Sequence, residues 1–333
     1  MKGFEDIKKI TIPFDLPNGP GPINVYLFCG SPLSLIDTGI KGKNTLRYID
    51  KGLEGTGFKI EDIDRIYITH GHIDHFGMAR RLSEISSAKI FVHSNDKHKV
   101  QVPFELLFER DFPLVKTYFK EAGVHADGLD GYYQSLKDLY AAFAEPIEAG
   151  VETLSDGEIV DCGARKLKVI HLPGHTSGTV GFYDDEGLLF AGDHLLAEIT
   201  PNPLLELSAR ARNGYQSLKS YLSSLKVTKK LDISLALPGH GKNIDDPPKL
   251  IDQFLSHHEE RKKEILKLLS ENEKTKWEVS CLLFGELQTI EIYLGLSEVE
   301  GHLELLEEER KVVKRKKEGI LYYSSDLKRT IQR

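Results

Sequence analysis

The sequence contains few cysteines, and they are not arranged as a disulfide framework or as an all-sulfur zinc site. Cys29, Cys162 and Cys281 are far apart, their number is odd, and none belongs to a Cys-x-x-Cys pair. Such usage is typical of a protein of the reducing cytosol. We expect each of the three thiols to be buried as a small apolar side chain.

The sequence also has no long apolar run and no excess of positive charge. No segment approaches the roughly 20 consecutive apolar residues that a membrane-spanning helix needs. Residues 1–6 lack the basic start and the apolar stretch of an export signal. The formal net charge of -7 argues against a general affinity for polyanions, although a local positive face would still attract phosphate. These absences indicate a cytoplasmic protein that does not engage a membrane.

Chain length and a change of composition near residue 250 indicate two folded units. The 333 residues suffice for one large and one small domain. Residues 1–250 alternate short β-rich runs with turn signals and amphipathic segments, and we expect them to form one domain. Residues 251–270 are helical and highly charged and are expected to be a connector. Residues 271–333 combine helices with a hairpin, which predicts a small winged-helix-like domain.

The periodicity of apolar residues predicts the individual elements. Strands are expected at 23–28, 34–37, 65–69, 89–92, 158–160, 167–170, 180–183, 188–191 and 233–237. Helices are expected at 46–53, 76–85, 215–225, 248–270, 277–285, 290–294 and 297–309, with a hairpin formed by 312–313 and 320–323.

The segment from about residue 100 to 149 differs from its surroundings and is interpreted as a helical insertion. It has no strand pattern, and its apolar residues recur at helical spacing. Nine of the chain's 28 Phe and Tyr residues lie in it, about twice the share that its length predicts. These aromatic side chains could line an apolar substrate pocket. Alternatively, they pack the insertion against the core, which we favour for each aromatic taken singly.

Four metal-ligand side chains, His70, His72, Asp74 and His75, follow a predicted strand within six residues. Imidazole nitrogens and carboxylate oxygens are the usual ligands of zinc and related divalent ions. On an extended segment His70 and His72 can point the same way, and Asp74 and His75 can face a second ion from the start of the next helix. The alternative, four polar residues in a surface loop, requires a chance assembly of this set.

This run resembles the His-x-His-x-Asp-His signature of the metallo-β-lactamase superfamily. Segments 35–39, 172–178, 190–193 and 237–241 resemble the family's other motifs, in the family's order and each after a predicted strand. The match spans roughly residues 7 to 245. It implies an α+β fold, a four-layer αββα sandwich whose strand-end loops converge on one or two metal ions.

The resemblance also implies the ligands, by position within each motif. One ion would be held by His70, His72 and His175, the second by Asp74, His75 and His240, with Asp193 as the bridge and Asp37 supporting the ligands from behind. Two divalent ions are therefore expected. Zinc is the first choice, and iron or manganese are also compatible with a bridging carboxylate.

The implied activity is hydrolysis by a hydroxide that bridges the two ions. Asp74 is expected to position this nucleophile and to carry its proton to the leaving group. His194, which follows Asp193, is a further candidate, either for contact with the substrate or for support of the ligands from behind. His93 and His171 also lie near strand ends, but they miss the motif positions and are interpreted as ordinary residues.

The substrate is not fixed by the fold, because the superfamily acts on several kinds of bond. Segment 254–261 and the predicted winged helix resemble the branch that includes β-lactamase-like protein 2 and glyoxalase II-like enzymes. The acidic chain and the aromatic insertion favour a small-molecule substrate, a thioester or another acyl ester. A lactone is a further alternative.

The competing interpretation is a single-strand-specific endoribonuclease or another phosphodiesterase. The predicted wing favours it through its basic residues Lys311, Lys314, Arg315, Lys316 and Lys317. The preceding helix argues against it, because its glutamates would repel phosphate: Glu298, Glu300, Glu304, Glu307, Glu308 and Glu309. Winged helices also serve as packing or dimerisation modules, so a homodimer is considered as well. We favour the small-molecule substrate over nucleic acid.

Overall fold

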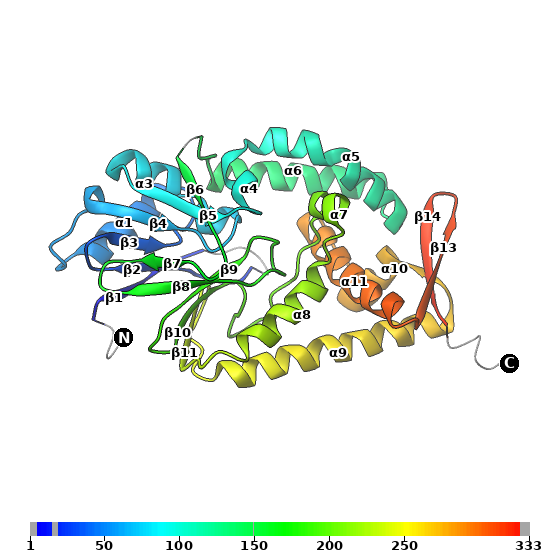
Figure 1. The fold of residues 1–333 in the computed structure, drawn as a ribbon. Coiled ribbons are helices and arrows are strands. Elements are labelled where there is room, and N and C mark those ends of the chain that lie inside the picture. Colours follow the sequence, from blue (N-terminus) through cyan, green and yellow to red (C-terminus); the bar gives the residue numbers. More distant parts are fainter. Residues whose placement is uncertain (1–4, 15–18, 149, 327–333) are drawn as a thin grey trace.

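The computed structural model describes residues 5–14, 19–148 and 150–326 and contains two packed sheets with helices on their outer faces (Figure 1). The N-terminal residues 1–4 and the last residues of the predicted C-terminal domain, 327–333, lie outside the described part. The first sheet has the order β1-β2-β3-β4-β5-β6 and the second the order β11-β10-β9-β8-β7. The predicted α+β sandwich is confirmed.

The strands of the two sheets have the following bounds. The first sheet contains β1 (Ile7–Ile12), β2 (Ile23–Phe28), β3 (Leu33–Ile36), β4 (Ile63–Tyr67), β5 (Lys89–His93) and β6 (Val151–Leu154). The second contains β7 (Ile159–Asp161), β8 (Lys166–His171), β9 (Val180–Tyr183), β10 (Leu188–Gly192) and β11 (Leu235–Pro238).

Period-two alternation explains the layers. In β2, Val25 and Leu27 pack toward the outer helices, whereas Tyr26 and Phe28 enter the cluster between the sheets. Every residue of β2 is buried, because both faces of its sheet are covered. The first sheet is covered by α1 (Lys43–Leu53) and α3 (Ala79–Ser86), and the second by α8 (Ser217–Thr228) and α9 (Pro247–Glu271).

The predicted helical insertion is present as a pair of long helices. α5 (Phe104–Ala122) and α6 (Ala126–Phe143) follow the short helix α4 (Lys97–Gln101). In Figure 1 the pair lies above the sheets, next to the C-terminal elements. A shared apolar cluster confirms this contact, because it joins Phe119 and Tyr132 to Leu296.

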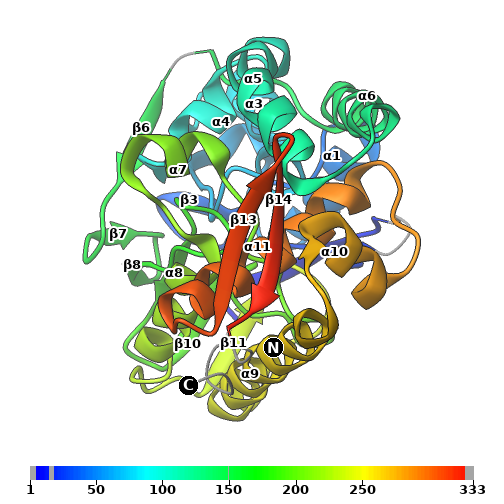
Figure 2. The same cartoon turned by 90° about the vertical axis from the view of Figure 1, so that its right-hand side faces the viewer.

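The C-terminal elements are two helices and a small sheet. They are α10 (Lys276–Phe284), α11 (Ile290–Glu308), and the strands β12 (Lys274–Thr275), β13 (Val312–Lys317) and β14 (Ile320–Ser325) in the order β12-β14-β13. Figure 2 shows the β13–β14 hairpin in front of these helices, with its tip near α5. α9 reaches from the second sheet to this group: Phe254 packs below the sheet and Leu269 packs in the C-terminal cluster.

Some predicted elements were wrong in detail. The segments 290–294 and 297–309 form the single helix α11, which continues through Gly295. A Cβ at Gly295 would lie 2.6 Å from Leu287 Cδ1, so the helix packs closely at this position. The helix expected at 76–85 is two helices, α2 (Ile73–Phe76) and α3, and strand β4 ends at Tyr67. Strands β1 and β6 and helix α7 (Leu207–Asn213) were not predicted.

Two general expectations have different outcomes. Of the three free thiols only Cys162 is buried, and Cys29 and Cys281 are partly exposed, so the expectation of burial was wrong for two of them. Within the described part of the chain, no helix is both long and apolar enough to pass through a membrane.

Candidate metal centre

The residues predicted as ligands meet at the carboxyl ends of four strands. His70 and His72 follow β4, and Asp74 and His75 lie in α2. His175 follows β8, Asp193 follows β10 directly, and His240 follows β11. Their ligand atoms form three overlapping groups: His70, His72 and His175; His70, His75 and Asp193; and Asp74, His75 and His240. The chain therefore brings together all seven predicted positions.

The first group is a tripod of imidazoles. His72 Nδ1 lies 3.0 Å from both His70 Nε2 and His175 Nε2. The outer nitrogen of His175 donates to the Asn202 carbonyl at 3.0 Å, and His70 Nδ1 lies 3.1 Å from Thr69 Oγ1. Because these outer nitrogens carry the protons, the inner nitrogens present lone pairs to the space between the rings.

The group of Asp74, His75 and His240 combines two imidazoles with a carboxylate. His240 Nε2 lies 3.3 Å from Asp74 Oδ2, and His75 Nε2 lies 3.9 Å from Asp74 Oδ1. His240 Nδ1 donates to the Gly21 carbonyl at 3.1 Å. Asp193 stands between the groups, since its Oδ1 is 3.4 Å from His75 Nε2 and its Oδ2 is 3.6 Å from His240 Nε2.

Unpartnered buried atoms show that a cation fits this space. His75 Nε2, His240 Nε2 and Asp193 Oδ1 are buried, and none of them has a hydrogen-bond partner among the described residues. Buried polar atoms without partners cost about 1–3 kcal/mol each, more if they are charged. A divalent ion between these atoms would satisfy all three, and imidazole with carboxylate is a donor set suited to zinc.

The ionisation of the cluster suits metal binding at two of the histidines. Burial lowers the pKa of His72 to about 3, and burial together with the neighbouring imidazoles lowers the pKa of His70 well below its usual value. Both rings are therefore neutral, as ligands must be. Burial opposes ionisation of Asp74, but His75 and His240 outweigh it and hold the pKa of Asp74 at about 2.

His75 behaves differently before metal binding. Burial lowers its pKa, yet the carboxylates of Asp193, Asp37 and Asp74 outweigh burial and raise the pKa well above the usual value for histidine. A proton therefore competes with a cation for this ring, which makes metal affinity dependent on pH.

Asp37 lies behind His75 and the loop that carries His70, where the family resemblance placed it. Its carboxylate is buried and accepts from the Thr69 backbone N–H at 2.8 Å, from Thr69 Oγ1 at 2.8 Å and from His75 Nδ1 at 2.8 Å. Its φ of 59° is uncommon for a residue with a side chain. These bonds fix the ring of His75 and the start of the loop that carries His70.

Glycine is required in the loop that carries His240. A Cβ on Gly239 would lie 2.5 Å from Asp193 Oδ1 and 2.7 Å from His75 Cε1. The loop backbone therefore lies directly against two of the candidate ligands.

The remaining histidines singled out from the sequence do not join the cluster. His194 is buried, and its Nε2 lies 2.8 Å from Thr228 Oγ1. Among the described residues, those that line the pocket next to the cluster, which is described below, do not include His194. This placement argues against substrate contact by His194. His93 and His171 stack on each other with ring centroids 4.0 Å apart, in keeping with an ordinary structural role.

Sequence reasoning missed a supporting network next to the first group. Asp96 is buried and accepts from the Gly71 backbone N–H at 2.8 Å and from Thr176 Oγ1 at 2.6 Å. Lys99 Nζ lies 2.7 Å from Asp96 Oδ1 and 2.6 Å from Glu206 Oε1. These residues come from separate segments without a local motif, so only the fold shows that they hold the two ligand loops together.

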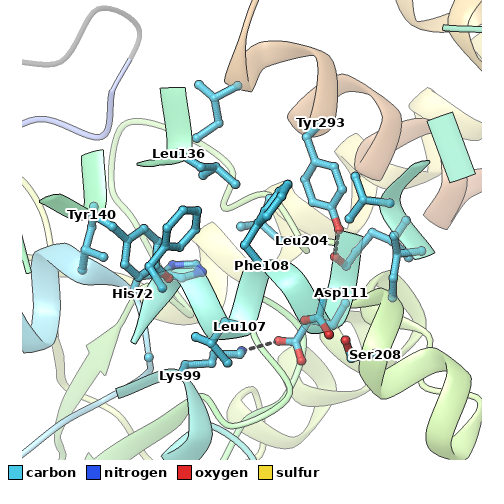
Figure 3. Close-up of a pocket in the computed structure, with 18 of the residues that line it drawn as sticks. His72, Lys99, Leu107, Phe108, Asp111, Leu136, Tyr140, Leu204, Ser208 and Tyr293 are labelled. Atoms are coloured by element: carbon cyan, nitrogen blue, oxygen red, sulfur yellow. Dashed lines mark hydrogen bonds and ion pairs between the residues drawn. The ribbon is translucent and has the colours of Figure 1, made fainter. Parts of the chain in front are cut away.

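A pocket of about 380 Å³ adjoins the cluster at His72 and Asp74 (Figure 3). Its wall is largely apolar and includes side chains of the insertion: Phe104, Leu107, Phe108, Val115, Tyr132, Leu136, Leu139 and Tyr140. Other aromatics of the insertion only pack, as Phe143 does against Phe14 with ring centroids 5.5 Å apart. Some aromatics of the insertion therefore line a pocket and others pack within the protein; binding of a substrate there stays a prediction.

A further group of potential ligands lies between α9 and α11. It consists of His257, His258 and Glu298. His258 Nδ1 is 3.2 Å from His302 Nε2, and Arg261 Nε is 3.7 Å from Glu298 Oε1. The Arg261 cation faces the Glu298 carboxylate, which offsets the charge of that carboxylate, while His258 Nε2 is buried without a hydrogen-bond partner among the described residues.

Comparison with known families and proteins agrees with this geometry. The family model described as the metallo-beta-lactamase superfamily matches residues 18–240. The Bacillus subtilis protein named "Probable metallo-hydrolase YqjP" is 29% identical over 327 residues, which covers 96% of this chain and 98% of that protein. A "Beta-lactamase-like protein 2 homolog" of Caenorhabditis elegans is 26% identical over 279 residues, which covers 81% of this chain and 75% of that protein.

Solved structures show the same similarity. A metallo-β-lactamase family protein of Thermus thermophilus superimposes with a TM-score of 0.80 at 26% identity, covering 96% of this chain and 98% of that chain. A β-lactamase domain protein of Burkholderia ambifaria shares the fold with a TM-score of 0.77 at 22% identity, covering 97% and 94% of the two chains.

Proposed function

The chain belongs to the metallo-β-lactamase superfamily and is a metal-dependent hydrolase, and from that premise we propose that it cleaves a thioester or another acyl ester of a small molecule. The observation that carries this proposal is the apolar pocket that opens directly at His72 and Asp74. An apolar wall favours an acyl group over the phosphate backbone of a nucleic acid, which needs exposed cations.

The cations around the pocket support the same choice. Lys99 is held between two carboxylates, and Arg110 pairs with Asp111 at 2.7 Å. Arg212, also in the wall, is exposed to solvent. Two of these three positive charges are therefore already neutralised by partners of the same chain, which leaves little attraction for a polyanion.

The proposed ligands are those that the sequence resemblance implies. His70, His72 and His175 would hold one ion, Asp74, His75 and His240 a second, and Asp193 both, with zinc as the first choice and iron or manganese as alternatives. When bound, such ions supply Lewis acidity toward the scissile carbonyl and lower the pKa of water.

The chain's own residues supply the remaining steps. Asp74 is the proposed proton carrier, because its side chain is 15% exposed, lines the pocket and is held ionised by His75 and His240. Its carboxylate can accept a proton from the attacking water and return it to the leaving thiol or alcohol. The apolar wall excludes bulk water, which strengthens these electrostatic interactions.

The C-terminal elements are proposed to be a winged-helix-like unit that packs rather than binds nucleic acid. Its wing lysines have carboxylate partners: Lys314 lies 2.8 Å from Glu307, and Lys316 lies 2.8 Å from Glu121 of the insertion. The second of these pairs ties the wing to α5. Basic residues that are engaged in this way are poorly placed to hold single-stranded RNA.

The test is a substrate screen on metal-loaded protein, with acyl thioesters, acyl esters, lactones and single-stranded RNA, and with elemental analysis of the same sample. We expect hydrolysis of acyl thioesters or esters that is lost in His72→Ala and kept in His125→Ala, a change of an exposed histidine far from the cluster in sequence. Cleavage of RNA but of no acyl substrate, lost in His72→Ala, would replace the proposal with the nuclease alternative.

A further inference from the structure

The C-terminal helix α11 contributes a wall to the pocket that opens at the metal centre. Ile290, Tyr293 and Leu294 of α11 line the same cavity as His72 and Asp74. In Figure 3, His72 and Tyr140 lie at one end of the pocket and Tyr293 at the other, with Phe108 and Leu136 between them. We propose that the pocket holds a straight apolar acyl chain and that α11 ends it, so that Tyr293 and Leu294 set the longest chain accepted. This inference rests on the proposed acyl-ester hydrolysis and deepens it.

The far wall is held rigidly by specific contacts. The ring of Tyr293 stacks on Tyr132 of α6 with centroids 5.0 Å apart, and its hydroxyl donates to the Leu205 carbonyl. Ser297 Oγ accepts from the Leu205 backbone N–H at 3.2 Å. A wall that is fixed from both sides can discriminate chain length, whereas a loose wall would yield to a longer chain.

The same wall is connected to the metal centre. The side-chain amide of Asn202 donates to the Leu294 carbonyl at 3.0 Å, and the Asn202 backbone carbonyl accepts from His175 Nδ1 at 3.0 Å. One residue thus bridges α11 and a candidate ligand. The separation between His175 and the far wall is therefore fixed through one residue, as a length selector requires.

The size of the cavity sets an expected limit. Its volume is about 380 Å³. A methylene is comparable to a water molecule, which takes about 30 Å³ of liquid volume, so the pocket has room for about twelve groups of this size. The two carboxyl oxygens take two of these places, which leaves room for a chain of about ten carbons. Each methylene that is buried there strengthens binding by about fourfold, which corresponds to about 0.8 kcal/mol. Longer chains have no further apolar wall to contact.

Binding of straight-chain carboxylic acids tests the pocket independently of catalysis. Isothermal titration of the zinc-loaded protein with acids of increasing length should show affinity that rises with each methylene and stops rising near ten carbons. The rate constants kcat/KM of the corresponding thioesters should follow the same profile. Affinity that does not depend on length, or that keeps rising well beyond this limit, would overturn the inference.

Two tryptophan variants with matched controls locate the wall. Leu294→Trp and Leu107→Trp fill the pocket from α11 and from α5, and each should lower the affinity ratio of decanoate to butanoate at least about tenfold, the effect of losing two methylene contacts. The controls are Leu282→Trp on α10 and Leu106→Trp on α5, both at exposed positions, with 58% and 56% of the side chain accessible. The controls should keep the wild-type ratio.

A variant that enlarges the pocket should have the opposite effect on the length of acid that is accepted. Tyr293→Ala should shift the limit to longer acids, and if this variant does not fold, the Leu294→Trp result decides. An unchanged ratio in folded Leu294→Trp contradicts the inference.

If acids bind with the expected profile but no acyl ester is hydrolysed, the length selector stands and the proposed function fails. If esters are hydrolysed without a length profile, the proposed function stands and the length selector fails.

Discussion

Four of the five histidines in the metal centre are fixed through the ring nitrogen that faces away from the cluster. His70 is held by Thr69, His175 by the Asn202 carbonyl and His240 by the Gly21 carbonyl. His75 is held by Asp37. Each bond sets the orientation and the tautomer of its ring, so the inner nitrogens are arranged before any ion arrives.

Replacing Asp37 tests this arrangement. Thr69 N–H donates to one carboxylate oxygen of Asp37 and His75 Nδ1 to the other, so in Asp37→Asn one of these donors faces an NH₂ group and loses its acceptor. We expect metal affinity, measured by competition with a chelating dye, to fall about 10- to 100-fold. The matched control is Asp184→Asn, a buried aspartate at the opposite end of β10. Equal affinities in the two variants would show that Asp37 does not position the ligands.

Gly239 tests the steric side of the same site. In Gly239→Ala the new methyl group would lie against Asp193 and His75, which must move. We expect the metal content to drop and the free energy of unfolding to decrease by about 1–3 kcal/mol, the usual cost of overpacking. Elemental analysis and chemical denaturation measure both effects. The control is Gly131→Ala in α6, where a methyl group meets no described atom within 4 Å. Full metal content in Gly239→Ala would refute the argument.

At this scale the sequence predicts much of the site. The run from His70 to His75 stands out by its own spacing, and the other candidate ligands and Asp37 lie in short motifs that the family resemblance identifies. Asp96 and Asn202 could not be found in this way, because each acts on partners that are distant in sequence. The same applies to the orientation of the His194 ring, which its position after Asp193 does not reveal.

The helices and strands explain why these loops meet. Strands β4, β8, β10 and β11 each end beside the cluster, which brings the loops that follow them together. Periodicity predicted most of these strands. It failed at α11, where Gly295 suggested a break, because close packing against Leu287 is a tertiary contact that a local pattern cannot contain.

α11 also carries a titratable group with an unusual environment. Burial raises the pKa of Glu304 to about 7. The negative charges of Glu300 and Glu307 also raise this pKa, whereas the positive charges of Arg210 and Lys276 lower it. Since this pKa is raised in the folded state, the folded state binds more protons than the unfolded state between about pH 4.5 and 7. Stability should therefore fall as the pH rises through that window.

Glu304→Gln should remove this part of the pH dependence. We expect the variant to lose less stability than the wild type between pH 4.5 and 8, by at most about 3 kcal/mol, which is the linkage energy of the shift. Thermal unfolding at a series of pH values measures the difference. Glu308→Gln, a change at an exposed carboxylate of the same helix, is the control. Parallel curves for wild type and Glu304→Gln would contradict the assignment.

Over the whole molecule, the insertion and the C-terminal elements act together. Tyr118 of α5 donates to the Leu296 carbonyl of α11 at 3.3 Å, and the wing reaches the insertion through Lys316 and Glu121. Resemblance to a family predicted the sandwich, and helical periodicity predicted both helical regions. Neither could predict that the two regions would share one cluster, because an amphipathic pattern does not identify the surface on which it packs.

The resulting architecture is a sandwich that carries the candidate metal centre, together with a helical cover, made of the insertion and α11, that shapes the pocket. The matches to the Bacillus subtilis and Thermus thermophilus proteins extend over almost the whole chain. The cover and the centre meet at His72, where the apolar wall begins. The proposed hydrolysis of an apolar acyl substrate needs both parts, because the centre supplies the chemistry and the cover binds the acyl group.

The most direct test of this proposed activity is the rate of octanoyl-thioester hydrolysis before chelation, after complete metal removal and after restoration with zinc. We predict that the rate is lost with the metal and returns with zinc in wild type, and that it does not return in Asp74→Ala. Undiminished hydrolysis by protein in which elemental analysis finds no residual metal would contradict metal-dependent catalysis at this centre.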